Sequence, residues 1–391
     1  MEDRMPAHRI LTTHAGSLPR PKALVHLLAA KAGGEEVNEA TLVREIEAAS
    51  AAVIAAQVES GVDIINDGEA GRESFFTYVR DRMTGFAGQG ARQVMRDIVM
   101  YPSFMQHMLS VIAARQSVSL MAPPQAVGDV AYKDDGAIKA ECARLKRLTD
   151  ALVHKPAGVF MTAASPGIVA AAMENKHYAT LGDYVAALGR ALSVEYRAIV
   201  GAGFTLQIDA PDLAMERHTL FADKPLEEFL AFSRSVIAAI NRATEGLPRE
   251  RVRLHVCWGN YNGPHECDEP IENLWSVLET AKVGGYVISL ANPRHEHEIS
   301  FFKGGRLPKT ATLIAGVIDT TTNYVEHPKV VAERLMRAVD AVGDPARVIA
   351  GTDCGFETSA GYVNVAEEVV WAKLRALRDG AALASRQVFG A

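Results

Sequence analysis

Cysteine is scarce in this chain of 391 residues, which contains only four. A disulfide framework needs more cysteines at closer spacing, so these thiols are expected to be free, as in a reducing compartment. Long apolar runs are missing too, because no uncharged stretch reaches the roughly 18 residues that a membrane span needs. Residues 1–16 show no apolar core of a signal peptide. These absences predict a cytoplasmic protein that does not enter a membrane.

An excess of positive charge is also absent. The chain has 41 Lys and Arg against 47 Asp and Glu, a net charge of −6, which argues against a nucleic-acid partner. Apolar residues, by contrast, make up 48% of the chain and charged residues 23%, the composition of a folded protein with a large core. No linker, repeat or low-complexity segment divides the sequence. We therefore expect a single catalytic domain over residues 1–391.

Short apolar, β-branched runs recur along the chain and end in polar or glycine-containing turns. The nine runs lie at residues 9–17, 62–69, 126–133, 158–167, 204–212, 252–260, 285–293, 312–320 and 347–355. Helical patterns separate them, as at 42–61, 184–203, 270–285 and 327–343, with Gly61 where a C-terminal helix cap belongs. This alternation predicts parallel βα units in an α/β fold, and about eight units close into a (β/α)8 TIM barrel.

Two parts of the sequence do not fit an eight-unit barrel. With nine runs, one must lie outside the barrel, and the candidates are the first run, at 9–17, and the third, at 126–133. The stretch 85–125 matches neither the strand nor the helix pattern of the other units. We expect it to be an inserted excursion over one face of the barrel, in the position of a lid.

The run at 252–260 raises the question of metal binding, because it contains His255 and Cys257. Side chains alternate along a strand, so this pair points to the same side. Cys354 ends another run about a hundred residues later, and the C-terminal ends of barrel strands meet at one mouth. One imidazole and two thiolates suit Zn²⁺. The alternative is that each cysteine is only a small buried apolar residue.

Several segments carry a family resemblance. They are TTHAGSLPRP (12–21), VDIINDGEAGRESFFTYV (62–79), LQIDAPDLAMERH (206–218), LHVCWGN (254–260) and AGTDCGFET (350–358). Together they resemble the cobalamin-independent methionine synthase family, and in particular its short, single-barrel members, over nearly the whole chain. The resemblance implies the same three zinc ligands that the strand pattern suggests.

The resemblance also implies a reaction and a substrate. A zinc-bound thiol, homocysteine first of all, attacks an electrophilic methyl group to give methionine, as in a 5-methyltetrahydropteroyltriglutamate–homocysteine S-methyltransferase. Glu69 and Asp209 match the two carboxylates that hold the substrate's amino group, and Ser17 matches the position that meets its carboxylate. The alternative for Glu69 and Asp209 is capping of the helices that follow them.

One departure from the family concerns the fourth zinc ligand. The family supplies a glutamate at the strand end before Asn-Pro, where this chain has Ser289. Serine is a poor zinc ligand, so zinc is held either by three residues and a water, as in catalytic sites, or by another group that moves in. The nearest groups in sequence are Glu266, Cys267 and Glu296.

A second departure concerns the methyl donor. Full-length members carry a histidine just after the aspartate that corresponds to Asp319, our candidate catalytic residue, and here that position is Thr321. The long enzymes also have an additional N-terminal barrel that helps to bind folate, for which this chain has no room. The donor therefore stays open among a methyl-corrinoid, free or on a protein partner, a sulfonium and other small electrophiles.

Three other functions are compatible with the sequence. A related branch, the epoxyalkane:coenzyme M transferases, adds a thiol to an epoxide at the same kind of zinc site and needs a basic clamp, for which Arg20, Arg72 and Arg294 are near predicted strand ends. A metal-free lyase of the uroporphyrinogen decarboxylase type uses the same barrel. A barrel that only binds a ligand is the third reading, and a homo-oligomer is left open in each case.

Overall fold

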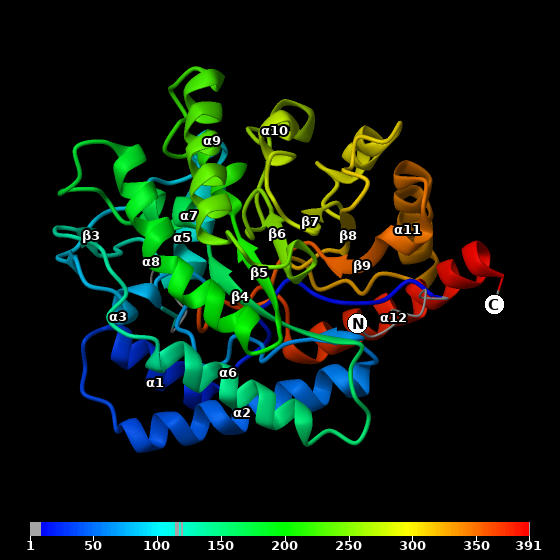
Figure 1. The fold of residues 1–391 in the computed structure, drawn as a ribbon, viewed down its shortest axis with the longest axis horizontal. Coiled ribbons are helices and arrows are strands. Elements are labelled where there is room, and N and C mark those ends of the chain that lie inside the picture. The colour runs from blue at the N-terminus through cyan, green and yellow to red at the C-terminus, as the bar shows by residue number, and fades with distance from the viewer. Residues whose placement is uncertain (1–8, 114–116, 119, 391) are drawn as a thin grey trace.

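The computed structural model describes residues 9–113, 117–118 and 120–390. Residues 1–8 of the segment that is expected to lack a signal peptide lie outside the described residues. The centre of the fold is a curled parallel sheet of seven strands in the order β1-β4-β5-β6-β7-β8-β9 (Figure 1). The strands are β1 (Ile64–Ile65), β4 (Gly158–Ala164), β5 (Thr205–Asp209), β6 (Val252–Val256), β7 (Gly285–Ser289), β8 (Thr312–Ile318) and β9 (Val348–Thr352).

The N-terminal segment closes this sheet. The amide of Thr13 donates to the carbonyl of Ala350 in β9 at 2.8 Å, and the amide of Ala350 donates to that of Leu11 at 2.8 Å. On the other side, the amide of Ile64 in β1 donates to the carbonyl of Thr12 at 3.0 Å. The segment therefore takes the eighth position, between β9 and β1, and the predicted TIM-barrel fold is confirmed.

A ring of helices surrounds the strands (Figure 1). Its members are α2 (Glu39–Ser60), α6 (Gly136–Asp150), α8 (Leu181–Gly201), α9 (Leu226–Ala243), α10 (Ile271–Leu278), the 3-10 helix η4 (Glu296–Phe302), α11 (Pro328–Val342) and α12 (Glu367–Phe389). Each contacts the next, and α12 packs against α2, so the ring is closed. Helices outside this ring include α1 (Lys22–Ala32), α3 (Val79–Arg82), α7 (Pro166–Ala172), η1 (Pro211–Leu213), η2 (Met215–His218), η3 (Arg249–Arg251) and η5 (Pro345–Arg347).

Local signals set the ends of these helices. The Asn38 side chain accepts a hydrogen bond from the amide of Thr41 at the start of α2, and Gly61 ends the helix with a φ of 77°. Glycine adopts this left-handed conformation without a steric penalty, so the predicted cap is confirmed. The prediction for α10 was too long, because the helix ends at Leu278 and the next residues form the turn into β7, which begins at Gly285.

The third apolar run lies outside the barrel, as one of the two alternatives predicted. There β3 (Gln125–Ala126) pairs antiparallel with β2 (Phe86–Ala87). Between them lie α4 (Arg96–Val99) and α5 (Pro102–Ala113), so the stretch 85–125 is an excursion from the barrel, as expected. Within the described part of the chain, no helix has the length and apolar character that crossing a membrane requires.

The strand β6 shows how the sequence builds the barrel wall. All five of its residues are buried. Its apolar side chains face the helices, whereas Arg253 and His255 alternate to the barrel interior. There the Arg253 guanidinium lies 3.9 Å from the centre of the Phe160 ring and donates to Gln207. Burial of Arg253 inside the barrel is thus accompanied by a hydrogen bond to Gln207 and a contact with the face of the Phe160 ring.

A buried ion pair ties α12 to the loop of Asp319. Lys373 Nζ lies 3.0 Å from Glu326 Oε2, both side chains are at most 2% exposed, and Glu326 Oε1 accepts the amide of Asp319. Lys373→Met leaves a buried carboxylate unpaired, so it should lower the free energy of unfolding by about 3–5 kcal/mol in urea denaturation. Lys303→Met, which breaks an exposed pair with Asp340, is the control and should change little. Equal effects of the two substitutions would contradict this expectation.

Candidate metal centre

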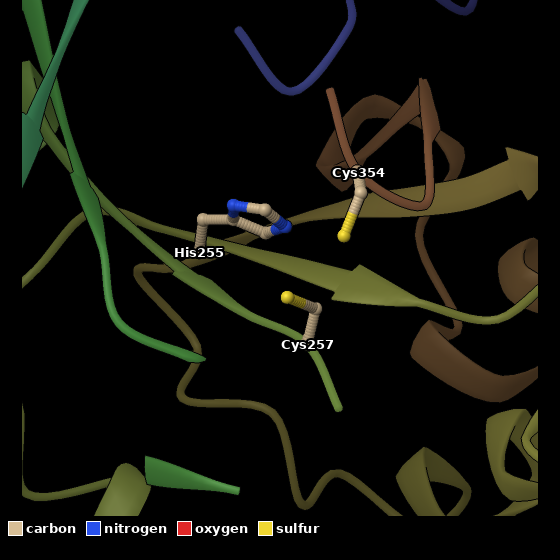
Figure 2. Close-up of side chains that lie close together, drawn as sticks. All are labelled: His255, Cys257 and Cys354. Atoms are coloured by element: carbon tan, nitrogen blue, oxygen red, sulfur yellow. The ribbon is translucent and has the colours of Figure 1, made fainter. Parts of the chain in front are cut away.

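Three side chains from two strand ends meet at the barrel mouth. His255 lies in β6, Cys257 follows that strand, and Cys354 follows β9. Figure 2 shows one ring nitrogen of His255 and the two sulfur atoms pointing toward one another. Their ligand atoms all lie within 4.8 Å of one another, and each residue is at most 5% exposed. The structure therefore brings together the three residues that the sequence predicted as a set.

The ionisation of these groups is linked. A hydrogen bond from the Cys354 thiol holds the pKa of Cys257 well below its usual range, and the same bond raises the pKa of Cys354. Burial lowers the pKa of His255, but the Cys257 thiolate and Asp209 outweigh burial and raise it to about 10. The protonation of each of these three groups therefore depends on that of the others. A bound dication would replace protons on the three groups, because metal ligands must be deprotonated.

The donor set fits zinc. One imidazole and two thiols form a soft, tetrahedral type of site, and three protein ligands with a free position are typical of catalytic zinc. His255 Nδ1 lies 2.9 Å from Asp209 Oδ1, which is the carboxylate contact that commonly orients a metal-binding histidine. Sequence reasoning did not find this contact of Asp209.

Ser289 stands where the resemblance implies the fourth zinc ligand, and its hydroxyl already makes a hydrogen bond. Ser289 Oγ donates to the main-chain carbonyl of Asp353 at 2.7 Å. The three groups considered as substitutes lie elsewhere: Glu266 contacts Tyr101, Cys267 contacts Met100, and Glu296 pairs with Arg334 and Arg337. None of them joins the His255 cluster among the residues that the structure describes.

This arrangement predicts the effect of restoring the family's glutamate. Ser289→Glu adds an anionic oxygen next to the three ligands, so zinc should leave the protein more slowly when a chelator is added. Thiol binding should be equal or weaker, since the new carboxylate competes for the free position. The exposed substitution Ser300→Glu is the control for added charge. Faster zinc loss from the Ser289 variant would show that the position is not open to a ligand.

Asp353 organises the loop that carries Cys354. Its carboxylate accepts hydrogen bonds from the amides of Leu290, Ala291 and Asn292 at 2.9 Å each. Burial raises the pKa of Asp353 to about 7. The residue therefore joins the end of β9 to the loop after β7, a role that its place beside Cys354 did not reveal in the sequence.

Glu69 lies in the barrel mouth with one carboxylate oxygen in use. Oε1 accepts a hydrogen bond from Thr162 Oγ1 at 3.0 Å, whereas buried Oε2 has no hydrogen-bond partner among the described residues. Burial and the charge of Asp209 raise the pKa of Glu69 to about 7. A side chain at Gly16 would place its Cβ 2.3 Å from Oε1, so glycine is needed there. The free oxygen suits an ammonium group.

Ser17 and Asp319 also lie near Cys354. The carbonyl of Ser17 accepts the amide of Phe356 at 2.8 Å, and its hydroxyl lies against Gly355, where a Cβ would approach within 2.1 Å. Asp319 accepts the amide and hydroxyl of Thr321, so its carboxylate orders its own loop. The catalytic role of Asp319 stays a prediction.

A small pocket lies on the Cys354 side of the barrel mouth. It is lined by residues that include Asn260, His265, Ser289, His295, Asp319, Thr321 and Cys354. Sequence reasoning placed Ser289, Asp319 and Cys354 at strand ends, but it missed His265 and His295, which come from loops. The pocket therefore has a thiol side and an imidazole side.

The closed barrel and this donor set define an α/β-barrel enzyme with a thiol-rich candidate metal centre at its mouth. The family model described as the catalytic domain of cobalamin-independent synthase matches residues 10–382. The chain therefore belongs to that family, and the resemblance seen in its motifs is confirmed.

Individual relatives are distant. The methionine synthase of Thermococcus kodakarensis is 24% identical over 347 residues, covering 88% of this chain and 86% of that protein. The 2-hydroxypropyl-CoM lyase of Xanthobacter autotrophicus is 25% identical over 403 residues, covering 95% and 94%. The solved B12-independent methionine synthase of Shewanella sp. W3-18-1, in complex with selenomethionine, has a TM-score of 0.73 at 19% identity over 98% of this chain and 100% of that one. The last likeness supports the fold.

Proposed function

We propose that this chain is a zinc-dependent methyltransferase that transfers a methyl group to the thiol of homocysteine to form methionine, and that the whole chain acts as one catalytic domain. The observation that carries the proposal is the pairing of two features in one barrel mouth. One is the convergence of His255, Cys257 and Cys354, and the other is the free, buried oxygen of Glu69. Membership of the family and the relatives named methionine synthase support it.

Each residue has a role in this reaction. His255 and the two cysteines would hold zinc, which would supply the positive charge that lowers the pKa of a substrate thiol and leaves the thiol deprotonated at neutral pH. Glu69 accepts hydrogen bonds from the substrate ammonium, and Asp209 adds a second negative charge while it orients His255. Ser17 is assigned to the substrate carboxylate because it matches the family's motif. Together these residues would hold the amino-acid end of the substrate while the metal centre holds its thiol.

The coenzyme M alternative is motivated by the 2-hydroxypropyl-CoM lyase among the relatives. It needs a free cation for a sulfonate, but Arg20 and Arg72 are buried and donate to main-chain oxygens and to a protein carboxylate. Arg294 also donates to main-chain oxygens. The carboxylates of Glu69 and Asp209 repel a sulfonate, so the geometry favours an amino-acid thiol.

The methyl donor enters from the pocket in this proposal. The family description, cobalamin-independent, weighs against the methyl-corrinoid that the sequence left open. We infer a small methyl donor that binds on the side of Asp319, opposite the thiol. The metal-free lyase is disfavoured because it gives no reason for an imidazole and two thiols to converge in a buried site.

One titration tests the choice of thiol. Zinc-loaded protein is titrated with homocysteine and with coenzyme M, and zinc X-ray absorption is read for a new zinc–sulfur bond. We expect homocysteine to bind with an added sulfur ligand and coenzyme M to bind weakly or not at all. Binding of coenzyme M but not of homocysteine would contradict the proposal. A fully folded protein that contains no zinc would favour the lyase.

A further inference from the structure

A second cluster of ligand-type side chains lies beside the first. His265 and Asp268 belong to the loop after β6, and His295 belongs to the loop after β7. His265 Nδ1 lies 2.8 Å from Asp268 Oδ2, and His295 Nε2 lies 2.7 Å from the same oxygen. All three side chains are at most 4% exposed, and their ligand atoms lie within 4.8 Å of one another.

The outward nitrogens of the two imidazoles differ in their contacts. His265 Nε2 lies 3.0 Å from the main-chain carbonyl of Tyr261. That oxygen only accepts, so Nε2 carries a hydrogen and the inward Nδ1 is bare when the ring is neutral. His295 Nδ1 lies 3.4 Å from Glu298 Oε2 and makes no hydrogen bond within the described residues. The bare nitrogen of His265 and the Asp268 carboxylate would repel each other unless positive charge lies between them.

That positive charge can be supplied by protons or by one metal ion. Burial lowers the pKa of both histidines, but Asp268 outweighs burial and raises the pKa of His265 and, with Glu298, that of His295 to about 9. A metal ion, in contrast, would leave both rings neutral. We propose that His265 Nδ1, His295 Nε2 and Asp268 bind a divalent transition-metal ion, distinct from the ion at the cysteines. Two imidazoles and one carboxylate are a recurrent ligand set for iron(II) and related metals. The contact of His265 Nε2 with the Tyr261 carbonyl is one that commonly orients a metal-binding histidine.

Two further observations support a built site. Asp268 Oδ1 is buried and makes no hydrogen bond within the described residues, although His218 Nε2 lies 3.1 Å away, so the carboxylate has acceptor capacity to spare. The His295 ring stacks on Trp258 with 3.8 Å between ring centres and an angle of 15°, which holds its orientation. Ligands that are held in place before binding lose less freedom when the ion arrives.

The position of this second site suggests its use. His265 and His295 line the same pocket as Cys354 and Asp319. A metal ion there can act as a Lewis acid toward an oxygen or nitrogen atom of a molecule in the pocket. The proposal of a second site does not depend on zinc at the cysteines or on homocysteine as substrate. It is tested by metal binding at His265, Asp268 and His295 alone.

Cobalt(II) separates the two sites by spectroscopy. The metal-free wild-type protein is titrated with Co²⁺ and followed in the near ultraviolet and the visible. We expect two saturable equivalents: one with the intense thiolate-to-cobalt charge-transfer band and one with weak visible bands only. Saturation at one equivalent, with the charge-transfer band, would overturn the proposal and identify the cluster as a protonated hydrogen-bond network.

Matched variants assign the equivalents. His295→Gln should remove the equivalent that lacks the charge-transfer band and keep the other, whereas Cys354→Ser should weaken the equivalent with the band and keep the one without it. The exposed neighbour His297 provides the control, and His297→Gln should keep both. Two full equivalents in the His295 variant would also overturn the proposal.

Discussion

Replacing Cys354 by serine is expected to release most of the zinc. Among the described residues, Cys354 supplies one of the three ligand atoms that meet in this cluster at the mouth of the barrel, and a serine hydroxyl is a poor ligand for zinc. Outer contacts of metal sites already change affinity by about 10–100-fold, so loss of a direct ligand should exceed that range. Zinc per chain, measured by elemental analysis after dialysis, reports the result.

Cys267 offers a matched control for this substitution. It is partly exposed, its sulfur contacts Met100, and it does not belong to the His255 cluster. Cys267→Ser should therefore keep the zinc content of the wild type. One zinc per chain in both variants would remove Cys354 from the proposed ligand set. Loss in both variants would show that folding, and not ligation, had changed.

The convergence of the three ligands could be predicted because it depends on two simple rules. Side chains alternate along a strand, which places His255 and Cys257 on one side, and the C-terminal ends of barrel strands share one mouth, which brings in Cys354. The first rule needs only a short stretch of sequence, and the second needs only the fold class. Neither requires knowledge of how loops are folded.

The contacts around the ligands could not be predicted in the same way. Asp209 meets His255 because β5 and β6 pair in a register that places these two residues opposite each other. The sequence separation of the strands does not specify this register. Ser289 meets the carbonyl of Asp353 because β7, β8 and β9 lie side by side, which brings the ends of β7 and β9 together.

The cluster of His265, Asp268 and His295 could not be predicted, because it depends on the conformation of loops. His265 adopts a φ of 55°, in the left-handed region that residues other than glycine seldom occupy, and this turns the chain of its loop. His295 comes from a different loop after the next strand. No periodic pattern relates the two histidines, so their meeting at Asp268 appears only in three dimensions.

Homocysteine should bind more tightly as the pH rises through neutrality, and Glu69 should be the reason. Burial and the charge of Asp209 raise the pKa of Glu69 to about 7, so the carboxyl is mostly neutral below that pH and mostly charged above it. An ammonium needs the charged form. Affinity should therefore rise by about tenfold between about pH 6 and pH 8, in proportion to the charged fraction.

A thiol without an amino group isolates this effect. 4-Mercaptobutyrate has the chain, thiol and carboxylate of homocysteine, so it shares every pH effect of the zinc and the thiol but has no ammonium for Glu69. Its affinity, measured by calorimetry on zinc-loaded protein, should lack the additional tenfold rise.

Glu69→Gln should weaken homocysteine binding by about 10–100-fold, the size of a lost charged hydrogen bond, and leave the binding of 4-mercaptobutyrate unchanged. This variant is cleaner than Asp209→Asn, because Asp209 also contacts His255. If both thiols show the same pH dependence on the wild-type protein, Glu69 does not bind the ammonium, and the choice of homocysteine loses its main support.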